Sequence, residues 1–216
     1  MEFEIFDLGQ VGFGKAWRFQ KDIFRIVQSD LFRHVLVLCR HDPVITVGRR
    51  NVNKNIKVPR KELRKKRISV YEIERGGDVT YHGPGQITAY PVFNLNYIKK
   101  DIHFFLRSLE GLAMDFFRGF GIKADRREGL TGVWVDNRKI ASVGIAVRNW
   151  ITFHGMSLNI KKTDLDNFSL IRPCGMDIQM TSLETQLKNE LDIDKVNAAF
   201  KEKCREFWGG PWRGAP

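Results

Sequence analysis

Apolar and polar residues follow regular patterns along most of the chain, and these patterns predict a mixture of strands and helices. Residues 3–8 (FEIFDL) and 34–39 (HVLVLC) have the length and apolar content of strands. Between them, over residues 11–32, apolar side chains recur at helical spacing, and they do so again over 102–120. Gly121 follows the second of these segments, where a glycine commonly ends a helix. The N-terminal half is therefore predicted to alternate strands with amphipathic helices.

From Gly132 to Ile160 the pattern changes to consecutive strands. The segments GVWVD, KIASVGIAV and ITFHGMSLNI are joined by Asp136-Asn137 and Arg148-Asn149, which are typical turn residues. This predicts an antiparallel meander, followed by an amphipathic helix near 194–208 and a short irregular tail over 209–216. A chain of 216 residues fits one domain, so we predict a single α/β domain (α+β) over 1–216, with a mixed sheet flanked by helices.

Composition places the chain among ordinary globular proteins, with 43% hydrophobic and 28% charged residues. The N-terminus lacks the features of a signal peptide, and no apolar run is long enough to span a bilayer, so we expect a cytoplasmic protein. The three cysteines are widely spaced and form no CxxC pair. This spacing argues against a disulfide framework and against a zinc site.

The formal net charge of +11 predicts an anionic partner, which charge alone does not identify. The densest basic segment is Lys57–Arg67 (KVPRKELRKKR), in which Pro59 is placed to open a short helix. A solvated helix face would have the same composition. The chain has no helix-turn-helix, zinc-finger or aromatic RNA-binding motif, so a nucleic-acid-binding module is a minor alternative.

Cys174 is the cysteine best placed for chemistry. It lies in Arg-Pro-Cys-Gly, where the proline stiffens the chain and the glycine leaves the sulfur accessible, although a buried loop cysteine would look the same. Cys39 closes an apolar strand and Cys204 lies in a helix, so packing explains both. A thiol with a pKa of roughly 8.5 needs a base or a cation to act as a nucleophile. His82 and His154 each precede a glycine, and the spacing of residues along the chain does not show which of them would be the base for Cys174.

The segment Arg75–Gln86 (RGGDVTYHGPGQ) is the densest cluster of glycine and polar residues. Its glycines allow backbone N–H groups to cradle an oxygen of a ligand, although a connection between strands would also use them. It matches neither a Walker loop nor a dinucleotide-binding fingerprint.

Three segments together carry a family resemblance: RGGDVTYHGPGQ, then RKIASVGIAVRNWITFHGMSLN, then RPCGM. In this order they resemble the octanoyl-[acyl-carrier-protein]:protein N-octanoyltransferases, the lipoate-protein ligase B type. The resemblance covers roughly residues 3 to 205. It implies the fold of the catalytic domain of lipoate and biotin protein ligases, a mixed sheet around an acyl-binding pocket.

The resemblance also implies a Cys/Lys dyad, formed by Cys174 and Lys139. Without it, Lys139 would be interpreted as an ordinary lysine of a hairpin turn. The implied reaction moves an octanoyl group from octanoyl-acyl carrier protein to Cys174 and then to a lysine of a lipoyl domain, the first step of endogenous protein lipoylation. The implied acceptors are lipoyl domains of 2-oxoacid dehydrogenase complexes or the glycine cleavage H protein. Neither ATP nor a cofactor is implied.

The same resemblance implies which residues hold the acyl group. His154 is a further pocket candidate, and we expect no metal site and a monomeric protein. Asp78 departs from the family, in which a longer polar side chain is common at this place. The implied binding residues are Arg75, Gly76, Gly77, Asp78, Val79, Thr80, Tyr81, His82, Ser142, Val143, Gly144, Gly155, Met156 and Ser157.

Two related activities are the main alternatives. An ATP-dependent lipoate or biotin protein ligase would have the same fold but would need no nucleophilic cysteine, so RPCGM argues against it. An amidotransferase that moves octanoyl between lipoyl proteins would keep the cysteine, and the three motifs together favour the carrier-protein donor.

Overall fold

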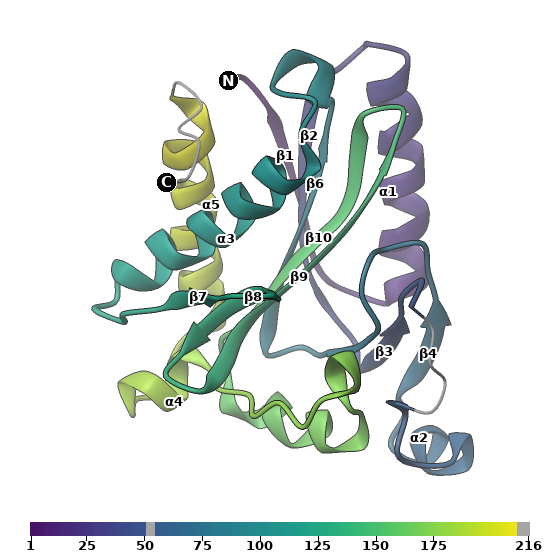
Figure 1. The fold of residues 1–216 in the computed structure, drawn as a ribbon, viewed down its shortest axis with the longest axis vertical. Coiled ribbons are helices and arrows are strands. Elements are labelled where there is room, and N and C mark those ends of the chain that lie inside the picture. The colour runs from purple at the N-terminus through teal and green to yellow at the C-terminus, as the bar shows by residue number, and fades with distance from the viewer. Residues whose placement is uncertain (51–54, 211–216) are drawn as a thin grey trace.

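A seven-stranded mixed sheet forms the centre of the fold (Figure 1). The computed structural model describes residues 1–50 and 55–210, apart from the side chain of Cys174. In space the strands follow the order β1, β2, β6, β10, β9, β8, β7; β1 and β2 are parallel and the other pairs antiparallel. Their bounds are β1 (Glu4–Val11), β2 (His34–His41), β6 (Gln86–Phe93), β7 (Asp125–Arg127), β8 (Leu130–Val135), β9 (Arg138–Arg148) and β10 (Ile151–Asn159).

The predicted antiparallel meander is confirmed, because β8, β9 and β10 are consecutive neighbours in the sheet. The two predicted turns connect them. Asp136 (φ +53°) and Asn149 (φ +52°) adopt the left-handed conformation that Asp and Asn tolerate better than other residues with a side chain. The short strand β7 was not predicted, since three polar residues carry no strand pattern.

Helices cover both faces of the sheet. α1 (Phe13–Gln28) packs Ala16, Ile23 and Val27 against one face, whereas α3 (Ile102–Arg118) and α5 (Ile193–Gly209) cover the other. The helix predicted over residues 11–32 is therefore shorter, because Val11 belongs to β1 and the helix ends at Gln28. The other two helices lie where the apolar spacing predicted them.

A smaller sheet of three strands lies at one end of the main sheet, with α2 (Arg60–Lys65) beside it (Figure 1). Its order is β4 (Ser69–Glu72), β3 (Val44–Val47), β5 (Val79–His82). The helix after Pro59 was predicted, but β3 was not, and β5 lies within the glycine-rich segment 75–86, where no strand was predicted. The remaining short elements are η2 (Leu95–Tyr97), η3 (Lys162–Leu170), η4 (Pro173–Gly175) and α4 (Leu183–Leu187). Residues 211–216 of the predicted tail lie outside the described residues.

Candidate active site

Lys139 lies near the start of β9, directly after the β8–β9 turn, and is only 6% exposed. Its ammonium group donates a hydrogen bond to the carbonyl oxygen of Thr131 (2.8 Å) and lies 5.2 Å from the centre of the Trp134 ring. Gly132 makes this position possible, because a Cβ there would lie 2.4 Å from Cε of Lys139. The lysine is therefore held beneath β8, unlike an ordinary solvated turn lysine.

The segment that follows RPCGM runs beside this lysine. The backbone N–H of Lys139 donates to Gln179 O (2.8 Å), and its carbonyl accepts from the N–H of Thr181 (3.0 Å). These bonds form a parallel bridge between Lys139 and Met180. Cys174 lies five residues before Gln179, in η4, but its side chain lies outside the described part of the structure. The fold thus brings the lysine next to the chain that carries the predicted nucleophile, and the dyad itself stays a prediction.

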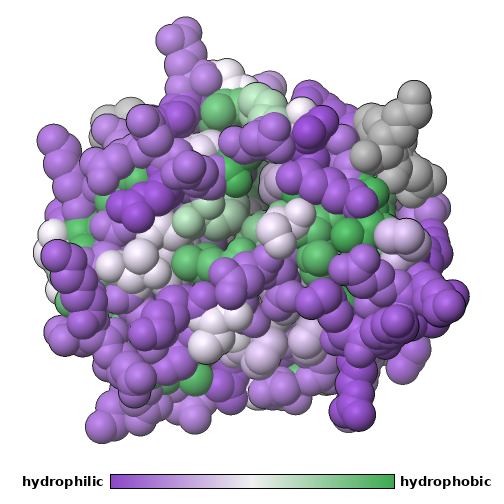
Figure 2. All heavy atoms as spheres, turned by 90° about the horizontal axis from the view of Figure 1, so that it is seen from below, coloured by the Kyte–Doolittle hydropathy of each residue, from purple (hydrophilic) through white to green (hydrophobic). Residues whose placement is uncertain are grey.

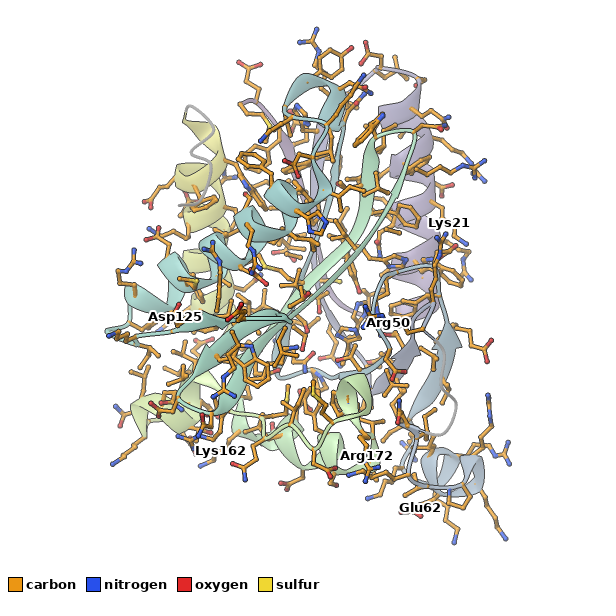
Figure 3. The ribbon with its side chains drawn as sticks, viewed as in Figure 1. Lys21, Arg50, Glu62, Asp125, Lys162 and Arg172 are labelled. Carbon is orange, nitrogen blue, oxygen red and sulfur yellow. The ribbon has the colours of Figure 1, made fainter. Side chains whose placement is uncertain are left out.

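A second segment, residues 55 and 56, pairs with the chain just before Cys174. Ile56 and Ile171 form an antiparallel bridge, and the N–H of Arg172 donates to Asn55 O (2.7 Å). In Figure 3, Arg172 lies at the same lower end of the molecule as Lys162 and Glu62 of α2. Figure 2 views this end from below: its surface is mostly hydrophilic, and hydrophobic side chains are visible in recesses between the polar ones. The predicted nucleophile is therefore part of a loop at this end.

The three predicted acyl-binding segments converge on β9 and β10. The two strands pair Ser142 with Ser157, Val143 with Met156 and Gly144 with Gly155. The glycine-rich segment joins them through the N–H of Gly76, which donates to Ile145 O (2.8 Å). A Cβ on Gly144 would lie 3.2 Å from Gly76 O, so any side chain there would push the two segments apart by a few tenths of an ångström. Residues separated by up to 81 positions, from Gly76 to Ser157, thus meet in one region.

Within the glycine-rich segment, Arg75 is a structural anchor. The residue is 8% exposed, and its guanidinium donates to the hydroxyl and to the carbonyl oxygen of Thr46 on β3. Gly77 has a φ of +85°, a conformation that favours glycine. After it the chain enters β5, in which Val79, Tyr81 and His82 are buried and Thr80 is half-buried.

Burial keeps the histidines near this region uncharged at neutral pH. It lowers the pKa of His82 well below its usual value, with repulsion from His41 and Arg75 adding to the effect, and it lowers the pKa of His41 to about 4. His154 is 1% exposed, and burial lowers its pKa although the Glu74 carboxylate opposes this shift. Neutral His154 then donates from Nε2 to Glu74 (3.3 Å). These histidines are hydrogen-bonded groups of the interior.

The other two cysteines are buried and unsuited to nucleophilic attack. Cys39 is 2% and Cys204 0% exposed, and burial strongly raises the pKa of both thiols. The sequence interpretation of both as packing residues agrees with this environment.

Two buried polar residues that sequence reasoning missed connect the motifs. Asn159 at the end of β10 donates to Thr181 O (3.0 Å) and to Lys139 O (3.4 Å), and its own carbonyl accepts from Gln86 (3.0 Å). Asp164 in η3 accepts from the N–H of Gly85 (2.5 Å), and burial raises its pKa. Asn159 is the last residue of the second family motif, whereas no sequence pattern marks Asp164. Both residues act through partners that are distant along the chain.

The model of one protein family, the lipoyl protein ligase A/B catalytic domain, matches residues 13–205 of this chain. The chain belongs to this family. An octanoyltransferase of Thermoanaerobacter pseudethanolicus is 42% identical over 208 residues, which cover 95% of this chain and 90% of that protein. The predicted resemblance to the octanoyltransferases and the acyltransferase class are therefore confirmed.

Solved structures confirm the predicted fold. A bi-partite lipoate protein ligase from Thermoplasma acidophilum matches with a TM-score of 0.76 and 20% identity, over 95% of this chain and 83% of that chain. The biotin protein ligase of Aquifex aeolicus in complex with biotin and ATP matches with a TM-score of 0.57 and 10% identity, over 94% and 69%. These similarities concern the fold alone.

Two general features of the described residues bear on the site. Across 1–50 and 55–210, no helix has both the length and the apolar character to cross a membrane. Over the same ranges, no group of three or more His, Cys, Asp or Glu side chains is arranged to hold a metal ion.

Proposed function

We propose that this protein transfers an octanoyl group from a carrier-protein thioester to a lysine of a lipoyl domain, through a thioester on Cys174. The observation that carries the proposal is the backbone pairing of Lys139 with Met180, six residues beyond the cysteine, in a chain whose relatives are octanoyltransferases. Transfer through an acyl-enzyme needs a nucleophile such as the cysteine of RPCGM, whereas activation of a free acid as an adenylate does not. We propose that the chain works as one cytoplasmic, monomeric catalytic domain.

In the first half-reaction, the thiolate of Cys174 attacks the carbonyl carbon of the donor thioester, and the carrier thiol leaves. An ammonium group near the sulfur stabilises the thiolate, and Lys139 returns a proton to the leaving thiol. In the second half-reaction, the ε-amine of the acceptor attacks the acyl-enzyme and forms an amide, the C–S bond breaks with the sulfur of Cys174 as leaving group, and the proton lost by nitrogen passes to that sulfur through Lys139. Because the donor is already activated as a thioester, no adenylate is required.

The glycine-rich segment Arg75–His82, residues 142–144 and residues 155–157 hold the acyl group in this proposal. The register of β9 and β10 and the bond from Gly76 to Ile145 support it, since they bring all three segments together. Ser142, Val143 and Gly144 are half-buried, so this part of β9 is accessible to a ligand.

The basic segment around α2 is proposed to dock an acidic carrier protein. Of the seven cationic residues in Lys57–Arg67, Lys57 pairs with Asp177, and the other six are exposed and form no ion pair with any other described residue. A cavity of about 630 Å³ between α2 and β4 is lined by arginines, and a neighbouring one of about 580 Å³ adds Lys15 and Arg18. A positive face of this kind accelerates encounter with an acidic partner. The six residues are Arg60, Lys61, Arg64, Lys65, Lys66 and Arg67.

Intact mass measurement after mixing the protein with octanoyl carrier protein, without ATP, tests the proposal. We expect the mass of one octanoyl group to be added to the wild type and to Cys39→Ser and Cys204→Ser, but not to Cys174→Ser. A requirement for ATP would favour a ligase, and octanoyl transfer only from another lipoyl protein would favour an amidotransferase.

A further inference from the structure

Asp78 carries a buried oxygen atom that lacks a partner. Its side chain is 6% exposed, and its Oδ2 accepts a hydrogen bond from the Asn55 amide. Across the described residues, Oδ1 has no hydrogen-bond partner, and Asp78 forms no ion pair. A carboxylate oxygen removed from water without a donor is costly, so a ligand group with an N–H has a vacant acceptor here.

The surroundings place this acceptor beside the cysteine loop. Asn55, which binds Asp78, also accepts from the N–H of Arg172, and its amide nitrogen lies 3.7 Å from the Cβ position of Gly175. Arg172 and Gly175 flank the backbone of Cys174. On its other side, Asp78 belongs to the glycine-rich segment, and its carbonyl accepts from the N–H of Gly48 (3.0 Å). The carboxylate therefore joins the glycine-rich segment to the loop that carries the proposed nucleophile.

Charge distinguishes the two groups that reach this loop during the proposed reaction. The donor thioester is neutral, and the attack of the thiolate moves its negative charge onto the carbonyl oxygen without creating a positive one. The acceptor lysine is a cation in water, with a reference pKa of about 10.4, and its nitrogen becomes positive again when it attacks the acyl-enzyme. A buried carboxylate stabilises the second of these steps and not the first.

We propose that Oδ1 of Asp78 accepts a hydrogen bond from the ε-amino group of the acceptor lysine and stabilises the charge that this nitrogen gains. The inference rests on the proposed function. The nitrogen lone pair forms the C–N bond, the C–S bond breaks, and the sulfur of Cys174 leaves with the electron pair. The extra proton on nitrogen passes to that sulfur through Lys139.

The substitution Asp78→Asn tests the proposal, because it retains an oxygen that accepts from Asn55 and replaces Oδ1 with an N–H donor. The two half-reactions are measured separately: formation of the octanoyl-enzyme from octanoyl carrier protein, then transfer from the isolated octanoyl-enzyme to a lipoyl domain. The transfer rate is expected to fall about ten- to a hundredfold further than the acylation rate, the value of one hydrogen bond to a charged group. Asp166→Asn, which neutralises an exposed carboxylate in η3, is the matched control and is expected to change neither rate.

Three results would overturn the role of Asp78. Slower acylation with normal transfer would mean that the carboxylate serves the donor, and equal slowing of both would mean that it only supports the fold. Wild-type transfer in Asp78→Asn would mean that it does not contact the amine. Failure of the wild type to form an octanoyl-enzyme would instead overturn the proposed function, and this inference with it.

Discussion

Because Gly132 has no side chain, the Lys139 side chain can pack against its backbone. The methyl group of an alanine at this position would fill the space that the lysine occupies. An added Cβ would lie 2.4 Å from Cε of Lys139, 3.0 Å from its Nζ and 2.6 Å from Ala141 O. The backbone oxygen cannot move without distorting β9, so the lysine side chain has to give way. Gly132 also has a φ of +126°, which a residue with a side chain rarely adopts.

Gly132→Ala is expected to lower both the stability of the protein and its rate of acylation. Backbone strain and overpacking each cost about 1–3 kcal/mol, so Gly132→Ala lowers the free energy of unfolding by a few kcal/mol. Displacement of Lys139 breaks its bond to Thr131 O and misplaces the proposed proton carrier. General acid–base groups contribute roughly 10²–10⁴-fold to rates, so acylation should slow by about a hundredfold.

Gly129→Ala is the matched control for this prediction. Gly129 has a positive φ of +72°, but no atom lies within 4 Å of its Cβ position. This variant should lose about 1–2 kcal/mol of stability and acylate within about twofold of wild type. Urea unfolding and the rate of acyl-enzyme formation are measured for both. If Gly132→Ala acylates as fast as Gly129→Ala while folded, the placement of Lys139 does not govern the reaction.

Three further predictions follow from burial and charge. Iodoacetamide should label the native protein once, at Cys174, because Cys39 and Cys204 are buried with raised pKa values; peptide mapping that finds either of them labelled at a similar rate would contradict this. The pKa of His41 is about 4 when folded and about 6.5 when unfolded, so the unfolded chain binds the extra proton and stability falls as pH drops through this range. Between pH 6.5 and 5 this loss is about 2 kcal/mol; urea unfolding should show a shallower pH dependence for His41→Gln, and an unchanged one would refute the assignment. A variant that combines Arg60→Glu, Arg64→Glu and Arg67→Glu reverses the charge near α2. It should raise the apparent KM for the acyl carrier several-fold at low salt, and an unchanged KM would exclude docking there.

The sequence predicts the meander well because turn residues separate its strands. It does not predict β3, whose four residues (Val44–Val47), three of them apolar, are too few to show a period and pair with strands far along the chain. β5 is hidden within a glycine-rich segment, and there tertiary pairing with β3 outweighs the local preference for a loop.

Prediction of the candidate site succeeds where a motif names the residue and fails where a role depends on a distant contact. Lys139 was identified by the family resemblance alone, since its local sequence is typical of a turn. The role of Gly132 depends on the Lys139 side chain that packs against it. The role of Asn159 depends on its hydrogen bond to the chain after RPCGM, and that of Asp164 on the hydrogen bond from the N–H of Gly85. The spacing of residues along the chain does not predict these contacts.

Transfer from an isolated acyl-enzyme tests the central claim most directly. Octanoyl-enzyme is separated from donor carrier protein and mixed with a lipoyl domain, without ATP, and both proteins are weighed by mass spectrometry over time. The proposed mechanism predicts that the octanoyl mass leaves the enzyme and appears on the lipoyl-domain lysine in a single turnover. An octanoyl-enzyme that is stable to the acceptor, or transfer that needs fresh donor or ATP, would contradict it.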